Sequence, residues 1–161
     1  MSSEIMLIEI SQIHGDEIET LIPLLLLAEP SESALRWSLG HLSDTAYRAE
    51  YAGQVIGVVT VRWGTEPCEI LELAIAEGHQ GKGFGKQIIE WLIAEARRRG
   101  KERLLVGTGN ASIGNIVFYQ RCGFRMDHVR RDYFWYYDEP IFEHGIQVRD
   151  MLTFSYDLTS D

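Results

Sequence analysis

The residues that most clearly suggest a chemical role in this sequence form a glycine-rich stretch, Gln80-Gly81-Lys82-Gly83-Phe84-Gly85. Glycines at alternate positions let the backbone approach a ligand closely and adopt left-handed conformations. Where such a turn opens a helix, the first main-chain N–H groups have no intrahelical partner. Those donors and the helix dipole together attract phosphate and other anions. The stretch therefore predicts an anion-binding turn.

Two common phosphate-binding motifs do not fit this stretch. A Walker loop needs a longer spacing than that between Gly81 and Gly85, and a Ser or Thr where Gln87 follows Lys86. A dinucleotide fingerprint needs two residues between its last glycines, but only one separates Gly83 from Gly85. From the glycines alone, a tight strand-to-helix turn without a ligand is the alternative.

The elements around the glycine-rich stretch are a strand and an amphipathic helix. The apolar run at residues 69–75 predicts a strand before the turn. The helix after it should reach Arg99 and stop at Gly100. Its predicted apolar face consists of Ile88, Ile89, Leu92, Ile93 and Ala96.

The segment before residue 69 predicts one strand, two short helices and a hairpin. Met6, Ile8 and Ile10 alternate as in a strand. Asp16 and Glu19 form a variant of the capping box that opens a helix. Pro23 should kink or shorten this helix. A second short helix should start at Pro30-Ser31 and end at Gly40. The hairpin should comprise residues 47–51 and 54–63, joined by Ala52-Gly53.

The C-terminal third predicts three strands and a helix. Strands are expected at 103–108, 124–133 and 148–158, and Asn110 or Ser112 can cap a short helix that ends at Cys122-Gly123. We see no repeat or linker. The pattern predicts a single α/β (α+β) domain over residues 1–161 with a largely antiparallel sheet.

Composition limits which binding partners and which cellular compartment are expected. The 161 residues carry a formal net charge of -9, which argues against a nucleic-acid partner. The longest apolar stretch, 21–28, is far shorter than a membrane span, so no membrane partner is expected. Two cysteines, Cys68 and Cys122, are typical of free thiols in a reducing compartment. A soluble cytoplasmic protein is therefore expected.

The glycine-rich stretch and a second segment together resemble the GCN5-related N-acetyltransferase (GNAT) family. Gln-x-x-Gly-x-Gly after a hydrophobic strand is similar to its signature, and the stretch from Ser112 to Gly123-Phe124, with Tyr119 in a short helix, is similar to its second landmark. The resemblance covers nearly the whole chain. It implies a mixed sheet of about seven strands, about four helices, and transfer of the acetyl group of acetyl-coenzyme A to a primary amine.

The resemblance also implies acetyl-coenzyme A as co-substrate and no metal. Loop amides would bind its pyrophosphate, while backbone groups of the preceding strand would align the pantetheine arm and polarise the thioester. Many members have Asn where this chain has Ser112, so Asn110 or Asn115 are alternatives for that contact. The implied coenzyme-binding residues are Leu73, Ala74, Ile75, Gln80, Gly81, Lys82, Gly83, Phe84, Gly85, Lys86, Asn110, Ser112, Asn115 and Phe118.

Three residues are candidates for acid and base chemistry. Tyr119 matches the family's tyrosine, whose phenol can hydrogen-bond the departing thiolate and return a proton. Glu69 lies where one branch of the family has its glutamate base, and Glu72 is the rival; in an extended strand the two should point to opposite faces. Another branch uses a glutamate where this chain has Gly107.

The connection 133–145 is unusually aromatic and acidic. Tyr133, Trp135, Tyr137 and Glu139 suit a cationic or aromatic amine, either a small molecule or a peptide. The same residue types suit a homodimer interface, and pocket and interface both stay open. The non-enzymatic alternative is an acyl-coenzyme A binding or regulatory domain that has lost its chemistry.

Overall fold

The computed structural model describes residues 6–160, which form two compact units. The first takes in residues up to Arg62 and residues 71–92, and the second takes in residues 63–70 and those from Ile93 onward. Strand β4 (Cys68–Ile75) and helix α3 (Phe84–Arg98) run through both. The prediction of a single domain over 1–161 stays a prediction.

The strands form a seven-stranded sheet in the order β1-β2-β3-β4-β5-β9-β6. Strands β4 and β5 (Arg103–Gly109) run parallel, whereas the β1–β2, β2–β3, β5–β9 and β6–β9 ladders are antiparallel. With four α-helices among the described residues, the predicted mixed α/β fold is confirmed. No helix in residues 6–160 is long and apolar enough to span a membrane.

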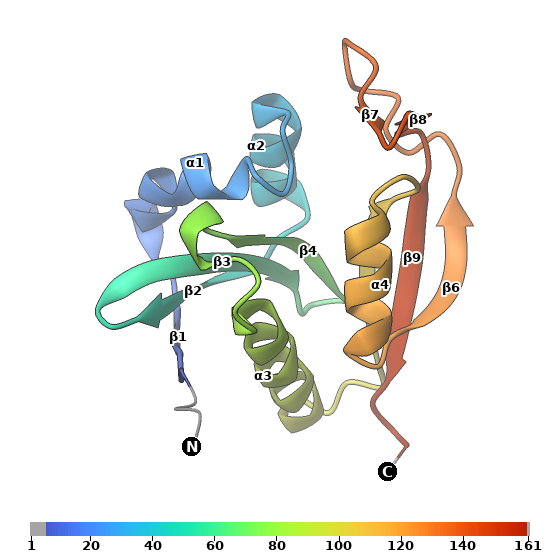
Figure 1. The fold of residues 1–161 in the computed structure, drawn as a ribbon. Helices are drawn as coiled ribbons and strands as arrows, with labels where there is room; N and C mark the ends of the chain where they lie inside the picture. The colour runs from blue at the N-terminus through green and yellow to red at the C-terminus, as the bar shows by residue number, and fades with distance from the viewer. Residues whose placement is uncertain (1–5, 161) are drawn as a thin grey trace, which may run out of the picture. The chain divides into compact units, whose positions relative to one another are not determined.

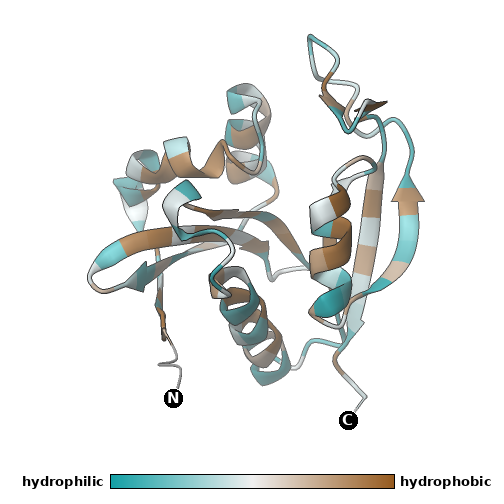
Figure 2. Ribbon diagram, viewed as in Figure 1, coloured by the Kyte–Doolittle hydropathy of each residue, from teal (hydrophilic) through white to brown (hydrophobic). Residues whose placement is uncertain are grey.

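The first unit packs short helices against a hairpin (Figure 1). Its elements before β4 are β1 (Glu9–Gln12), the 3₁₀ helix η1 (Gly15–Leu21), α1 (Ile22–Leu25), α2 (Glu32–His41), β2 (Thr45–Tyr51) and β3 (Gln54–Arg62). A core of side chains from β3, η1, α1, α2 and the connection between β1 and η1 joins them: Ile13, Leu21, Ile22, Leu25, Leu35 and Val58. Figure 2 shows hydrophobic residues along α1. The predicted hairpin is confirmed, with its turn at Ala52-Gly53.

The start of the chain differs from the sequence prediction in two places. The first strand begins at Glu9 rather than Met6. The predicted capping box was wrong, because left-handed Gly15 opens a 3₁₀ helix whose N-cap is His14 and has no side-chain hydrogen bond. Ser31, in contrast, caps α2 as expected by accepting a hydrogen bond from the Ala34 amide.

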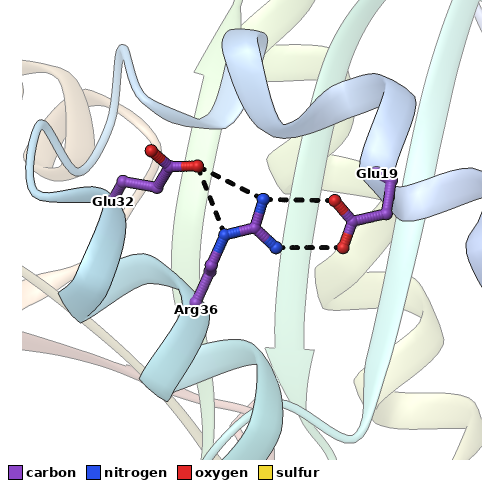
Figure 3. A network of polar contacts seen from close by, with 3 residues as sticks. All are labelled: Glu19, Glu32 and Arg36. Carbon is purple, nitrogen blue, oxygen red and sulfur yellow. Dashed lines mark hydrogen bonds and ion pairs between the residues drawn. The ribbon is translucent and has the colours of Figure 1, made fainter.

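A polar network ties η1 to α2 (Figure 3). The Arg36 guanidinium donates to both carboxylate oxygens of Glu19, at 3.0 and 3.2 Å, and to Glu32 one turn away. These hydrogen bonds hold the pKa of Glu19 below its usual range. Because all three side chains are exposed, solvent screens the attraction, so the network orients the two helices more than it stabilises them.

The second unit places a helix on one face of β5, β9 and β6. Its remaining elements are α4 (Ile113–Arg121), β6 (Arg125–Arg130), β7 (Phe142–Glu143), β8 (Ile146–Gln147) and β9 (Met151–Asp157). Helix α4 lies along β9 (Figure 1), and the ring centres of Tyr119 and Phe154 are 6.1 Å apart. Gly123, at φ +99°, ends this helix as predicted.

The connection between β6 and β9 contains a small hairpin that the sequence prediction missed. Strands β7 and β8 pair through Phe142 with Gln147 and Glu143 with Ile146. His144 and Gly145 between them both have positive φ, at 52° and 73°, as a two-residue turn requires. The aromatic run and this hairpin therefore form an ordered insertion rather than a plain loop.

Candidate active site

The glycine-rich stretch forms the predicted turn in the first unit. Gly81 and Gly83 have φ values of 75° and 85°, in the left-handed region that other residues avoid. The first hydrogen bond of α3 runs from the Gln87 N–H to the Gly83 carbonyl. Among the described residues, nothing accepts from the three N–H groups of residues 84–86 that precede it. The turn thus presents a row of free donors at the positive end of a 15-residue helix.

Two side chains of this stretch hold the turn rather than reach outward. The Gln80 amide donates to the Ile75 carbonyl at 3.0 Å, which ties the turn back to the end of β4. Phe84 is 1% exposed and packs against the rings of Tyr51 and His79. A ligand at the turn would therefore meet the Phe84 main chain and not its ring.

The exposed side chains and the strand end complete this part of the site. Lys82 and Lys86 are exposed, and the ammonium of Lys86 lies 3.9 Å from Glu90. On β4, Ala74 is buried while Leu73 and Ile75 are half-buried. Along the chain, the end of β4 and Lys82 precede the free donors, and Lys86 carries the last of them.

The candidate base Glu72 is buried against β3. It is 8% exposed, and its carboxylate accepts a hydrogen bond from the Thr60 hydroxyl. The same hydroxyl accepts from the Glu72 main-chain N–H at 3.0 Å. Both the main-chain N–H and the carboxylate of Glu72 are therefore hydrogen-bonded to Thr60.

The other candidate base, Glu69, has a different environment in the second unit. Its side chain is 14% exposed, and its carboxylate lies 3.5 Å from Nη2 of Arg130 on β6. Within residues 6–160 this carboxylate makes no hydrogen bond. Burial along β4 alternates, so that Glu69 falls among the half-buried residues and Glu72 among the buried ones.

Tyr119 lies on the buried side of α4. It is 7% exposed and contacts the rings of Phe118, Phe124 and Phe154. Burial, and secondarily the nearby Cys122 thiol, raises the pKa of the Tyr119 phenol well above its usual value of 10. The phenol therefore keeps its proton throughout the physiological pH range.

This burial predicts an alkaline stability effect. Well below pH 10 the phenol is neutral in both native and unfolded chains. The contribution of the buried phenol to the free energy of unfolding is therefore fully present there. Above about pH 10 only the unfolded chain loses the proton, and stability falls as pH rises. The free energy of unfolding of wild type should fall more between pH 10 and 11 than that of Tyr119→Phe, by about 1 kcal/mol. Urea titrations at pH 8, 10 and 11 measure this difference, and equal slopes would contradict it.

The polar side chains near the start of α4 mostly form hydrogen bonds with other residues of the second unit. Asn110 accepts from the main-chain N–H groups of Arg149 and Asp150 and donates to the Gln147 carbonyl. The Ser112 hydroxyl donates to Glu143 at 3.0 Å, and the Asn115 amide donates to Thr108. Asn110 thus holds the base of the β7–β8 hairpin. Exposed Asn115 and half-buried Phe118 and Ser112 stay predicted coenzyme contacts.

The connection before β9 lines an open cavity of about 240 Å³. Of the four predicted acceptor-binding residues, Trp135 and Tyr137 line it, whereas Tyr133 and Glu139 do not. Tyr133 instead lies beneath the Arg130 guanidinium, 6.0 Å from it. The sequence prediction missed three charged lining residues, Asp132, Asp138 and Arg149, because no periodic pattern marks residues of an irregular connection.

Comparison with known proteins agrees with this arrangement. Residues 13–124 match the model of the acetyltransferase (GNAT) family, which is more than half of the chain. The chain is 40% identical to the uncharacterized N-acetyltransferase YvbK of Bacillus subtilis, over 98% of this chain and all of that one. The chain therefore belongs to the GNAT family and is an acetyl-coenzyme A dependent N-acetyltransferase.

Two solved structures share both the fold and substantial identity. A GNAT family acetyltransferase from Elizabethkingia anophelis with acetyl-coenzyme A bound has a TM-score of 0.85 at 35% identity, covering 93% of this chain and 97% of that one. A Bacillus subtilis acetyltransferase in complex with coenzyme A has a TM-score of 0.79 at 39% identity, with the same coverage. The predicted family is thus confirmed.

Proposed function

We propose that this chain transfers the acetyl group of acetyl-coenzyme A to a primary amine by direct attack. The observation that carries the proposal is the row of three free main-chain donors after two left-handed glycines at the start of α3. This donor set fits the coenzyme's diphosphate because such a group needs several N–H donors and a close backbone approach. Lys82 and Lys86 add positive charge beside it along the chain.

The proposed chemistry joins the amine nitrogen to the acetyl carbon while the carbon–sulfur bond breaks. Acetyl-coenzyme A supplies the acetyl group as a thioester. Main-chain N–H groups of β4 near Leu73 stabilise negative charge on the acetyl oxygen. Glu69 accepts the proton that the amine must lose, directly or through one water. Its carboxylate has no hydrogen bond among the described residues, which supports Glu69 over Glu72.

Tyr119 is proposed to act on the departing sulfur. A thiolate of pKa about 8.5 is a weaker base than phenolate, and burial raises the pKa of the Tyr119 phenol further. Complete proton transfer to sulfur is therefore uphill, and the phenol stabilises the developing thiolate chiefly by donating a hydrogen bond. Proton return can then follow from solvent.

A thiol-release assay over a panel of primary amines tests the function. Wild type should release coenzyme A with at least one amine, and Tyr119→Phe should lower kcat about tenfold because one hydrogen bond to a charged group is lost. The coenzyme's Kd should stay within threefold. If the coenzyme binds tightly but no amine supports release, the chain is instead a non-catalytic acyl-coenzyme A binding domain.

We further propose that the connection 133–145 binds the acceptor, together with the neighbouring residues that line the same cavity. The 240 Å³ cavity supports the pocket interpretation of this connection over a homodimer interface. The protein is also proposed to work in the cytoplasm. Within residues 6–160 neither Cys68 nor Cys122 forms a disulfide, which supports a reducing compartment.

A further inference from the structure

Arg130 reaches across two strands to Glu69. In the sheet order β4-β5-β9-β6, strands β5 and β9 lie between their two strands, yet Nη2 of Arg130 is 3.5 Å from the Glu69 carboxylate. Gly107 on β5 has no side chain, and a Cβ there would overlap the Met151 thioether. The ion pair therefore lies over the surface of the sheet rather than between neighbouring strands.

This ion pair lies on the side of β9 opposite to α4. Phe154 of β9 faces α4 through its contact with Tyr119, so the preceding Thr153 points to the other side. Thr153 is paired in register with both Gly107 and His128, and Arg130 is paired with Met151. Directly opposed residues in a sheet share a face. The Arg130 side chain therefore lies on the same face of the sheet as Thr153.

The Arg130 guanidinium uses only part of its hydrogen-bonding capacity. Its Nη2 pairs with Glu69, its Nε lies 3.5 Å from His128, and its guanidinium lies over the Tyr133 ring. Within residues 6–160 its Nη1 has no hydrogen-bond partner. Charge-assisted pairs of guanidinium and carboxylate usually measure about 2.7–2.9 Å and are often bidentate. The long single contact to Glu69 leaves the planar fork of Arg130 available to a second carboxylate.

A second polar group on this face also lacks a partner. The Thr153 hydroxyl is 1% exposed and makes no hydrogen bond to the described residues. Leaving such a buried hydroxyl without a hydrogen bond destabilises the folded protein. A bound ligand with hydrogen-bonding atoms would recover part of this free energy.

The Glu69 contact also opposes the role proposed for Glu69. While it stays there, the Arg130 guanidinium occupies one carboxylate oxygen of Glu69 and competes for it with the amine of an acceptor. If Arg130 turns to an anionic group on the acceptor, Glu69 is released next to the amine that must lose its proton. Recognition of the acceptor and activation of the base are then one event.

We infer that Arg130 binds a carboxylate of the acceptor, so that the acceptor class is amino acids and related small molecules that carry a carboxylate beside the primary amine. This inference rests on the proposed function, with Glu69 as base. Arg130 is then the residue that determines specificity. The planar guanidinium fork matches a carboxylate in a way that a lysine ammonium does not.

Matched substrate pairs test this inference with coenzyme A release as the readout. Each α-amino acid of a panel is compared with its decarboxylated amine, for example tyrosine with tyramine and histidine with histamine. Wild type should favour the amino acid at least tenfold in kcat/KM for the best pair. Arg130→Met should lower kcat/KM for that amino acid about 30-fold and should not lower the value for its amine, because Glu69 is then free of its ion pair. Arg130→Lys should recover only part of the preference.

Arg131→Met is the matched control, because Arg131 is the exposed neighbour of Arg130 and is outside this ion pair. It should leave the preference unchanged. Equal use of both members of every pair by wild type, or an equal loss for both in Arg130→Met, would overturn the inference while the transferase function stands. Release with neither member of any pair, nor with any other amine, would instead overturn the proposed function.

Discussion

Glu69→Gln should lower kcat/KM for the amine about 300-fold at pH 7.5, since a general base typically contributes a factor of 10² to 10⁴. The amide keeps the size of the side chain but cannot accept the proton. The defect should shrink as pH approaches 10, because an amine with a pKa near that of lysine then reaches the site already deprotonated. Initial rates of wild type and variant from pH 6.5 to 10 measure both effects.

Glu72→Gln is the matched control for this substitution. Glu72 lies three residues away on the same strand, but its carboxylate is buried and bound by Thr60. We expect Glu72→Gln to lower the melting temperature and to change kcat/KM less than fivefold. If Glu72→Gln shows the large pH-dependent loss and Glu69→Gln does not, the base is Glu72.

Gly83→Val should weaken acetyl-coenzyme A binding at least 100-fold, which corresponds to about 2.7 kcal/mol. A β-branched residue at φ +85° is strained, and relief of this strain would turn the free N–H groups at the start of α3 away from the diphosphate. Isothermal titration calorimetry with acetyl-coenzyme A measures the Kd directly.

Gly78→Ala is the matched control for the turn. Gly78 lies five residues before Gly83, has no positive φ, and has open space at the position of a Cβ. This variant should bind acetyl-coenzyme A within threefold of wild type. If Gly83→Val binds as tightly as Gly78→Ala while both remain folded, the donors of this turn do not hold the coenzyme.

The parts of the site that depend on local geometry could be predicted from the sequence. Positive φ at Gly81 and Gly83 and the free donors before Gln87 follow from a glycine turn that opens a helix. The end of α3 near Gly100 and the end of α4 at Gly123 follow from the same preference for left-handed glycine. These features need only a few neighbouring residues.

The parts that depend on distant strands could not be predicted. The pairing of Arg130 with Glu69 requires the order β4-β5-β9-β6, which the hydrophobic pattern does not specify. The raised pKa of Tyr119 depends on burial against Phe154, a residue of the last strand. At the start of the chain, the apparent capping box was misleading, because Gly15 in the left-handed region starts a 3₁₀ helix there.

The three hydrogen bonds of Asn110 have an evolutionary consequence. One amide side chain just after β5 fastens residues 147, 149 and 150, so the last part of the insertion between β6 and β9 is anchored before the final strand begins. Substitutions earlier in the insertion leave these three hydrogen bonds in place, so they can accumulate without a shift of β9. Under the proposed role of this insertion in acceptor binding, its contacts to the acceptor can change while Arg130 on β6 and the glycine-rich turn stay as they are.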